Sequence, residues 1–221
     1  MLQVINYYRT FKHGKIVFEK QNMNVVIIKY NAGNIESVNN ALLRLGVKAE
    51  ITADHDKIRA ADKVIFPGVG EASTTMAYLR EQKLDTLIKS LQHPVLGICL
   101  GLQLMCAHSE ENDTECLGIF HEKVRRFSPK PEDEFKLKVP HMGWNSISNL
   151  KSNLFSKSME QKHVYFVHSF YAEKSEHTIA TCDYVLPFSA ALQRHNFYAT
   201  QFHPEKSGDL GSQILENFIN L

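Results

Sequence analysis

The chain has 221 residues, 43% of them hydrophobic and 22% charged, which is ordinary for a globular protein that builds its own core. Its 25 basic and 24 acidic residues leave a net charge of +1, so bulk charge favours neither a nucleic acid nor a membrane as a partner. No apolar stretch is long enough to span a bilayer, and the four cysteines follow no secretory leader and form no metal-binding pair, which predicts free thiols in a cytoplasmic setting.

The first 22 residues are predicted to be an extension of the domain that follows. They mix aromatic and basic residues without a clear period, whereas Met23 directly precedes the first convincing strand, Asn24–Lys29. Three interpretations of this stretch stay open: an extension, a poorly ordered arm, or a start codon placed too early. In each of them, residues 23–221 form the functional domain.

Strands and helices alternate over the next part of the chain. After the first strand, apolar residues at helical spacing predict a helix that begins near Ile35 and that Gly46 ends. A strand, a short helix and another strand are then predicted at Val47–Ile51, Asp54–Ala60 and Lys63–Phe66. This alternation favours a largely parallel sheet, whose functional loops gather at the carboxyl ends of the strands. The loop Pro67–Gly70 falls at such an end.

A cysteine stands at the next strand end. After two predicted helices within Ala72–Leu91, the apolar run Pro94–Ile98 predicts a buried strand, and apolar residues at helical spacing follow Cys99. Gly97 and Gly101 leave room for close backbone approach and for unusual dihedral angles. This pattern is typical of a nucleophile elbow, and the helix N-terminus would favour thiolate over thiol. The alternative is an unreactive core thiol.

Beyond residue 107, a polar loop at Ser109–Asp113 and several short strands predict a partly antiparallel addition to the sheet. The strand candidates are Lys123–Phe127, Val139–Ile147, His163–Val167, Thr178–Cys182, Phe188–Gln193 and Phe197–Thr200. An amphipathic helix ends the chain, and Asp209 is expected to cap its start. We therefore predict a single-domain α/β fold with a largely parallel central sheet flanked by helices and an additional antiparallel region.

A proton partner for Cys99 is expected near the far end of the chain. A cysteine nucleophile needs a histidine, and the histidine works best when a carboxylate orients its second nitrogen. His203 follows a strand candidate, and Pro204 favours an extended conformation for it. In an extended run, residues two apart point to the same side, so Glu205 is expected beside His203. A chance pair on a surface loop is the alternative.

The two motifs together resemble those of the class I (triad) glutamine amidotransferases. Gly97-Ile-Cys-Leu-Gly-Leu-Gln103 matches the family pattern G-x-C-x-G-x-Q, and Gln201-Phe-His-Pro-Glu205 matches the later H-x-E. The resemblance implies a flavodoxin-like fold and release of ammonia from L-glutamine without a metal or organic cofactor. It also implies that Cys99 is the nucleophile, that His203 is the acid and base, and that Glu205 orients His203.

The resemblance extends to the residues around this triad. It implies that the backbone N–H groups of Val69 and Leu100 form the oxyanion hole. The residues expected to contact glutamine are Gly68, Gly70, Gln103, Glu111, Ser169 and Phe170. These are expectations from the family motif, since neither spacing nor composition assigns them.

Within the family, the match narrows to the glutaminase subunits of imidazole glycerol phosphate synthases. It runs from about Asn24 to the C-terminus and includes Gly33-Asn34, Pro67–Gly70, Pro140–Asn145, Tyr165–Ser169 and His203–Ser207. It implies a heterodimer with a (β/α)8 cyclase subunit, with Asn34, Trp144 and Lys206 near the interface. Two positions depart from the pattern, since Lys29 and Asn31 stand where an acidic residue and a glycine are expected.

Two other functions stay open. A free-standing cysteine hydrolase of the same fold would need no partner, and the subfamily stretches argue against it. A catalytically idle binding subunit would lose part of the triad, whereas Cys99, His203 and Glu205 are all present. No chemistry is assigned to His141 or His168, although the resemblance implies that Pro140–Asn145 and His168 lie near the glutamine site or the subunit interface. The remaining cysteines are expected to be ordinary free thiols: Cys106, Cys116 and Cys182.

Overall fold

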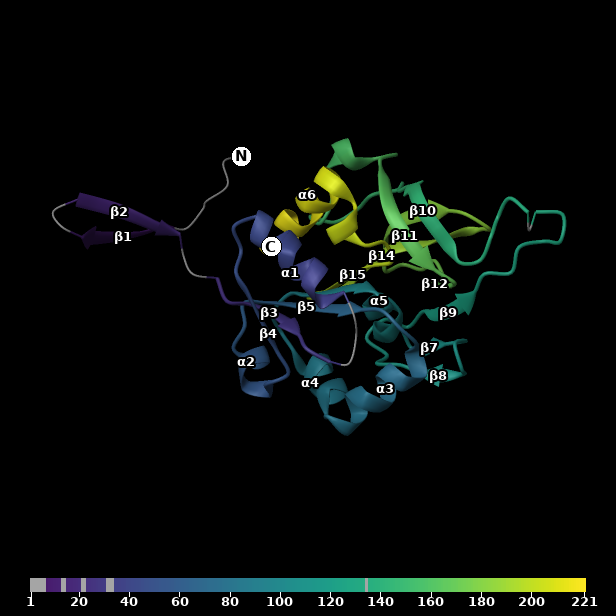
Figure 1. Ribbon diagram of the computed structural model, residues 1–221, viewed down its shortest axis with the longest axis horizontal. Helices are drawn as coiled ribbons and strands as arrows, with labels where there is room; N and C mark the ends of the chain where they lie inside the picture. Colours follow the sequence, from purple (N-terminus) through teal and green to yellow (C-terminus); the bar gives the residue numbers. More distant parts are fainter. Residues whose placement is uncertain (1–6, 13–14, 21–22, 31–33, 134) are drawn as a thin grey trace.

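The computed structural model describes residues 7–12, 15–20, 23–30, 34–133 and 135–221, and its centre is a seven-stranded sheet (Figure 1). The strand order is β13-β14-β15-β6-β5-β3-β4, in which β15, β6, β5, β3 and β4 are parallel and β13 and β14 are antiparallel additions. These strands are β3 (Val25–Ile28), β4 (Ala49–Thr52), β5 (Lys63–Gly68), β6 (Val95–Cys99), β13 (Thr178–Asp183), β14 (Pro187–Arg194) and β15 (Phe197–Thr200). The predicted parallel sheet with an antiparallel addition is confirmed.

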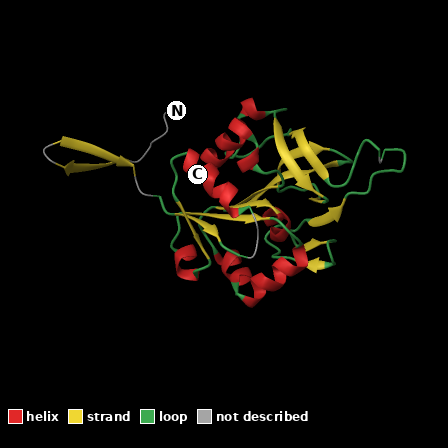
Figure 2. Ribbon diagram, viewed as in Figure 1, coloured by secondary structure: helices red, strands yellow, loops and turns green. Residues whose placement is uncertain are grey.

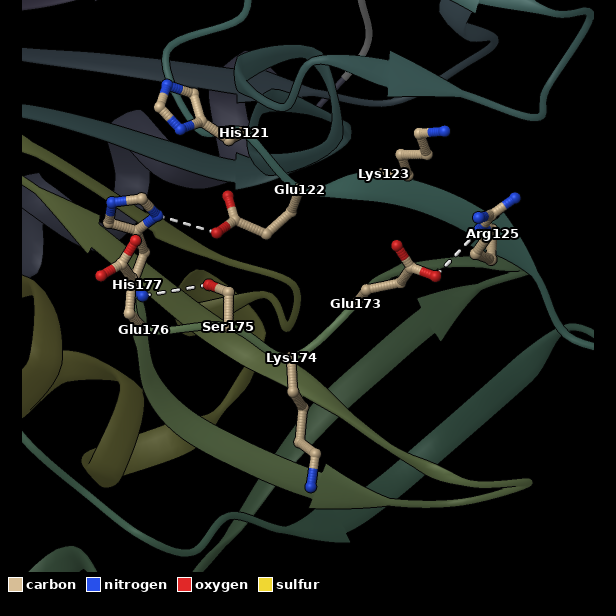
Figure 3. Close-up of a pocket in the computed structure, with 9 residues that line it drawn as sticks. All are labelled: His121, Glu122, Lys123, Arg125, Glu173, Lys174, Ser175, Glu176 and His177. Carbon is tan, nitrogen blue, oxygen red and sulfur yellow. Dashed lines mark hydrogen bonds and ion pairs between the residues drawn. The ribbon is translucent and has the colours of Figure 1, made fainter.

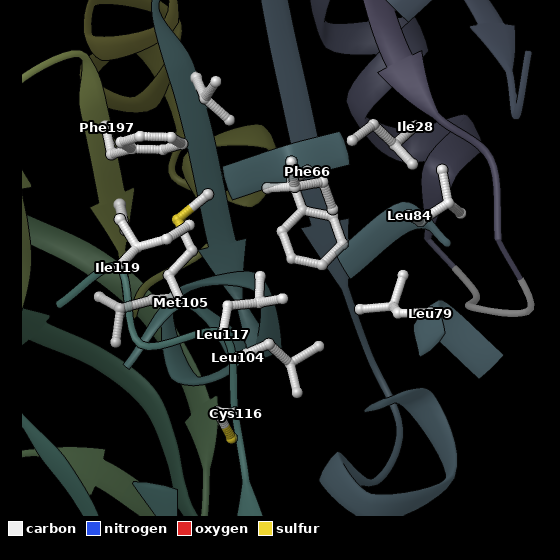
Figure 4. Close-up of a cluster of buried hydrophobic side chains, with 14 of the residues drawn as sticks. Ile28, Phe66, Leu79, Leu84, Leu104, Met105, Cys116, Leu117, Ile119 and Phe197 are labelled. Carbon is white, nitrogen blue, oxygen red and sulfur yellow. The ribbon is translucent and has the colours of Figure 1, made fainter. Parts of the chain in front are cut away.

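Helices cover both faces of this sheet (Figure 2). They are α1 (Ile35–Arg44), α2 (His55–Arg59), α3 (Ala72–Glu81), α4 (Leu84–Ser90), α5 (Leu100–Met105) and α6 (Gly208–Ile219). Strand β3 is buried along its whole length, because alternate residues enter different cores. Val25 and Ile27 pack with side chains of α1 and α6, whereas Val26 and Ile28 pack with side chains of α2 to α5. Figure 4 shows part of the core that contains Val26 and Ile28, where Ile28, Phe66 and Leu84 lie together.

Among the described residues, no helix has the length and apolarity needed to cross a membrane.

Two smaller sheets follow α5 in the chain. One contains β12 (Phe170–Ala172), β9 (Lys123–Arg126), β7 (His108–Ser109) and β8 (Thr114–Glu115), and the other pairs β10 (His141–Ser146) with β11 (His163–His168). Two 3₁₀ turns also occur, η1 (Lys157–Met159) and η2 (Pro204–Lys206). The predicted polar loop at Ser109–Asp113 is largely the turn between β7 and β8. Strand β12 was not predicted, because three residues are too short for a detectable alternation.

The helix ends differ from the prediction at one place. Gly46 adopts a φ of 74° just after α1, as expected of a glycine that ends a helix. Asp209, however, does not cap α6, because the cap position is Ser207 and Asp209 lies in the first turn. The Ser207 hydroxyl donates instead to the carbonyl of His203 at 2.7 Å. Asp209 still carries a charge that favours the positive end of the helix.

The N-terminal stretch contains a β-hairpin. Strands β1 (Tyr7–Lys12) and β2 (Lys15–Lys20) pair antiparallel with each other and belong to no other sheet of the described residues. Figure 1 shows the hairpin, in dark purple, standing apart from the rest of the chain. No strands were expected there, because the mixture of aromatic and basic residues lacks a clear alternation. The division of the chain at residue 22 stays a prediction.

Candidate active site

Cys99 lies at the carboxyl end of the central strand β6, directly before α5. Its backbone is strained, with φ of 55° and ψ of −105°, values that residues other than glycine rarely adopt. The residue is buried, with 7% of its surface exposed. The predicted strand–turn–helix elbow is therefore present, and the unusual dihedral angle falls on the cysteine itself.

The neighbouring glycines serve packing rather than unusual dihedral angles. A Cβ atom on Gly101 would lie 2.1 Å from the carbonyl oxygen of Phe66, so only glycine lets α5 approach β5 this closely. On Gly97, a Cβ atom would lie 2.9 Å from Sδ of Met105. Neither glycine has a positive φ. The expectation of unusual dihedral angles at these two positions was wrong, whereas the expectation of close approach is confirmed.

The histidine expected to accept the proton comes from the adjacent strand. Strands β6 and β15 are parallel neighbours, with Thr200 opposite Ile98, so the segment after β15 emerges beside Cys99. His203 is buried and its backbone is extended. Its Nδ1 lies 2.8 Å from Oε1 of Glu205. The predicted pair is confirmed, but a 3₁₀ turn at η2, not a continued extended run, brings the carboxylate back to the ring.

Electrostatics favour the charged form of this histidine. Burial by itself would lower the pKa of His203, but the negative charge of Cys99 and the Glu205 carboxylate oppose burial and raise the pKa to about 10. Nε2 of His203 is buried and has no hydrogen-bond partner among the described residues, although the ring faces the same cavity as Cys99. This nitrogen is therefore available for proton transfer to and from a bound molecule.

A cavity of about 340 Å³ lies in front of Cys99 and His203. Its lining includes the predicted residues Val69, Gly70, Cys99, Leu100, Gln103, Glu111, Ser169, Phe170 and His203. It also includes Pro140 and His168, which the resemblance placed near the glutamine site or the interface without a role, and Val167, for which nothing was expected. Gly68, which was also expected to contact glutamine, lies beside Cys99 in the register of β5 and β6 but is not among the lining residues. A Cβ atom there would lie 2.7 Å from Oη of Tyr30, so this position also needs glycine.

The predicted glutamine contacts have defined hydrogen-bond partners of their own. Gln103 is buried, and its Nε2 donates to the carbonyl of Phe170 at 2.9 Å and to Oε1 of Gln201 at 3.1 Å. Glu111 accepts a hydrogen bond from the backbone N–H of Ala72 at 2.8 Å through Oε2, which leaves Oε1 for a bound molecule. Burial raises the pKa of Glu111 above its ordinary value. Gln201 was part of the quoted motif, but no role was assigned to it.

Two buried histidines back one wall of the cavity. Nδ1 of His141 lies 3.1 Å from Nε2 of His168, and Nδ1 of His168 donates to the carbonyl of Phe170 at 2.7 Å. Burial lowers the pKa of His141 to about 4 and that of His168 to about 3, so both are neutral near neutral pH. The resemblance placed His168 near the glutamine site or the interface, and its place in the lining agrees with the first.

The three residues expected near an interface lie in different settings. Trp144 is 55% exposed on β10, and Lys206 is exposed on η2. Asn34 instead turns its side chain inward, and its Nδ2 donates to Oε1 of Glu205. Asn34 adopts a left-handed backbone conformation that asparagine tolerates, and this conformation aims the side chain at the triad. Asn31 and Gly33 lie outside the described residues, and Lys29 is exposed.

A second hollow, of about 650 Å³, is lined by residues of β9, by the two residues before it and by the segment between β12 and β13 (Figure 3). It shares no lining residue with the cavity around Cys99. Of its two histidines, His121 and His177, the second is paired with a carboxylate, since its Nδ1 lies 2.8 Å from Oε1 of Glu122. None of its lining residues is a cysteine, so it offers no thiol nucleophile.

The other cysteines are buried free thiols, as expected. Burial raises the pKa of Cys106 well above its ordinary value and raises those of Cys116 and Cys182 to about 12, so all three are unreactive thiols near neutral pH. Within the described ranges, no group of three or more histidine, cysteine, aspartate or glutamate side chains is arranged to hold a metal ion.

Comparison with known proteins agrees with this geometry. The family model for glutamine amidotransferase class-I matches residues 26–221. The imidazole glycerol phosphate synthase subunit HisH of Bacteroides fragilis (strain YCH46) is 61% identical over 199 residues, which are 90% of this chain and 100% of the relative. The subunit of the same name from Escherichia coli (strain K12) is 45% identical over 201 residues, with the same two shares.

Similarity to solved structures concerns the fold alone. A glutamine amidotransferase from Thermotoga maritima has a TM-score of 0.59 at 16% identity, covering 90% of this chain and 81% of that chain. Another structure described as a glutamine amidotransferase has a TM-score of 0.67 at 19% identity, covering 88% and 97%. The sheet with helices on both faces therefore belongs to a known architecture.

Proposed function

The chain belongs to the class-I glutamine amidotransferase family, and we propose that it acts as the glutaminase subunit of an imidazole glycerol phosphate synthase. In this role it hydrolyses L-glutamine to glutamate and supplies ammonia for histidine biosynthesis. The observation that carries the proposal is the buried His203–Glu205 pair in the same cavity as a strained Cys99. Relatives of 45% and 61% identity, matched over their whole length, support the assignment to this synthase.

The reaction begins with attack of the Cys99 thiolate on the side-chain amide carbon of glutamine. A sulfur–carbon bond forms, and the carbonyl oxygen becomes an oxyanion that backbone N–H groups of Val69 and Leu100 stabilise. His203 then donates its Nε2 proton to the departing nitrogen, the carbon–nitrogen bond breaks, and ammonia leaves a glutamyl thioester. A water molecule gives a proton to the same nitrogen and attacks the thioester, which releases glutamate and returns the thiolate.

The far end of glutamine is held by the inner wall of the cavity. Glu111 offers its second carboxylate oxygen to the α-ammonium group, because the first oxygen is occupied by Ala72. The backbone of Ser169 and Phe170 and the loop at Gly70 form the rest of this wall. Gln103 supports this wall through Phe170 and Gln201, since its amide nitrogen donates one hydrogen to each of them.

The ammonia acceptor is a separate protein, a (β/α)8 cyclase in a heterodimer with this chain. Ammonia must stay out of bulk water to remain unprotonated, so the partner covers the active-site face of the sheet. Exposed side chains near that face include Met142 at 63% and Trp144 at 55%. Because catalysis without an acceptor would waste glutamine, we expect the isolated chain to turn over slowly until a partner with bound substrate docks.

The test follows glutamate release from the full chain with and without a candidate cyclase. The Cys99→Ala variant is expected to lose at least about 10⁴-fold in rate, as removal of a nucleophile does. Cys182→Ala is the matched control, since this thiol is buried on β13 outside the cavity and its loss should leave the rate unchanged. Hydrolysis that persists in Cys99→Ala would refute the nucleophile assignment.

The same assay separates the alternatives. A free-standing hydrolase would turn over equally well with and without the cyclase, and an idle binding protein would release no glutamate in either case. The proposal expects turnover that rises when the cyclase and its substrate are added.

A further inference from the structure

We propose that Gln201 is a further catalytic residue, whose side-chain amide donates a hydrogen bond to the Cys99 sulfur and is held in this orientation by a buried chain of hydrogen bonds. The inference rests on the proposed function only in naming Cys99 as the reacting group. Gln201 lies directly after β15 and is completely buried. Its Nε2 is 3.8 Å from Sγ of Cys99, a separation compatible with a hydrogen bond to the large sulfur atom.

The orientation of the Gln201 amide follows from its other neighbour. The Nε2 group of Gln103 has two hydrogens, and it donates one to the carbonyl of Phe170 and the other to Gln201. An amide nitrogen only donates, so the atom of Gln201 that faces Gln103 must be its oxygen. The nitrogen of Gln201 therefore faces Cys99, and turning the amide over would place two donors against each other.

The Phe170 carbonyl is fixed from its other side by the two neutral histidines. Because Nδ1 of His168 donates to this carbonyl, Nε2 of His168 must accept a hydrogen from Nδ1 of His141. Nε2 of His141 then accepts from Nδ2 of Asn145 at 3.4 Å, and the same Nδ2 donates to the carbonyl of Asp183 at 2.9 Å. Each proton position in this chain is determined by the next, so one arrangement satisfies all members.

This arrangement stabilises the charged sulfur before it attacks. A donor beside a thiolate lowers its free energy relative to the thiol, whereas a thioester sulfur carries no charge and gains little. Gln201 therefore favours the state of Cys99 that is ready to react. The chain of hydrogen bonds ends at Asn145, beside exposed Trp144 on β10. A displacement of that strand would therefore shift the Gln201 donor relative to the Cys99 sulfur.

The experiment measures how fast iodoacetamide alkylates Cys99 in the full chain at neutral pH. Peptide mass spectrometry distinguishes this cysteine from the three buried thiols. Gln201→Leu removes the donor at similar volume, and we expect alkylation about tenfold slower, the effect of losing one charge-assisted hydrogen bond. Gln201→Glu keeps the shape but places a carboxylate against the sulfur, and we expect at least the same loss. A rate within about twofold of the wild type in either folded variant would overturn the proposal.

Two further variants complete the design. Gln213→Glu adds the same charge on the exposed side of α6 and should leave the alkylation rate unchanged. Gln103→Glu has no amide hydrogens, so Gln201 is expected to turn its nitrogen toward the new carboxylate and its oxygen toward Cys99, which again slows alkylation. An unchanged rate in Gln103→Glu would refute the orientation argument. If replacements of Gln201 unfold the chain, as a thermal melt would reveal, Gln103→Glu decides.

The alkylation rate is independent of the proposed function. A wild-type chain that never hydrolyses glutamine would refute the glutaminase assignment and still allow the Gln201 contact to be measured. Conversely, an active glutaminase whose Cys99 reacts equally fast without the Gln201 amide would keep its function and lose this inference.

Discussion

The proposed acid and base, His203, has one ring nitrogen on Glu205 and the other on the cavity side without a partner among the described residues. The Glu205 carboxylate touches the ring nitrogen that faces away from the cavity, so it stabilises the charged imidazolium and fixes the ring orientation. Asn34 donates to the same carboxylate oxygen and keeps it in place. With the Cys99 sulfur also beside it, His203 is protonated near neutral pH, as the acid role proposed for it requires.

The surroundings of His203, with the Cys99 sulfur and the Glu205 carboxylate beside the ring, also contribute to stability. The folded-state pKa of His203, about 10, lies above its ordinary value of 6.5, so the folded chain binds the proton more tightly than the unfolded chain does. The resulting stabilisation is fully present below pH 6.5 and is lost as the pH rises through about 10. Alkaline conditions should thus remove both this stabilisation and the proton that the leaving nitrogen requires.

Glu205→Gln tests the role of the carboxylate. Without its negative charge the pKa of His203 should fall, so the alkaline decline of glutamine hydrolysis is expected to move to lower pH. The measurement is the pH dependence of kcat in the complete synthase. Glu216→Gln, on the exposed side of α6, is the control and should leave the profile in place. A Glu205→Gln profile that coincides with the wild type would contradict the assignment.

At the level of single elements, the short helix α5 is positioned by contact rather than by its own length. Six residues form a marginal helix in isolation, but every residue of α5 is buried. Gly101 lets its backbone touch the end of β5, where the Pro67–Gly70 loop begins. The elbow and the loop expected to hold the oxyanion are thus kept together by one close approach of two backbones.

Gly101→Ala should disturb this contact. The added methyl group would meet the Phe66 carbonyl, a backbone atom that cannot turn aside, and overpacking of this kind costs about 1–3 kcal/mol. Urea unfolding measures the loss, and glutamine hydrolysis should fall with it because Cys99 is displaced. Gly118→Ala is the control, since it has open space and only its φ of 67° opposes a side chain. A Gly101→Ala chain as stable as the wild type would show that the approach is not limiting.

For the molecule as a whole, the site exists because the sheet gathers strand ends from distant parts of the chain. Strands β5, β6 and β15 lie side by side and parallel, so their carboxyl ends open on one edge. The smaller sheets close the cavity from above with Pro140 and the segment Val167–Phe170. The N-terminal hairpin contributes to none of these sheets among the described residues.

Removal of residues 1–22 should therefore leave the domain intact. We expect the midpoint of thermal unfolding to change by less than about 2 °C, which corresponds to less than about 1 kcal/mol for a domain of this size. Glutamine hydrolysis in the presence of the cyclase should also be unchanged. A markedly lower midpoint would mean that the hairpin stabilises the domain and that the boundary at residue 22 is wrong.

The sequence by itself determined the elements and the chemistry of the motifs. Apolar periodicity and glycines predicted the parallel strands, the helices α1 to α6 and the elbow at Cys99, because these patterns reflect local geometry and burial. The motif around His203 likewise predicted that Glu205 lies beside the His203 ring. Strand β12 and the cap of α6 were not predicted correctly, since three residues or one side chain carry too little local signal.

Only the tertiary structure decided which distant groups meet. The inward turn of Asn34 to Glu205, the contact of Gln201 with Cys99 and the buried pair of His141 and His168 each join residues that lie far apart in the chain. No local pattern encodes such contacts, because hydrogen-bond partners across a core are set by strand order and register. Once the strands are paired, burial makes these polar groups satisfy one another, and that requirement fixes the direction of each hydrogen bond around the reactive sulfur.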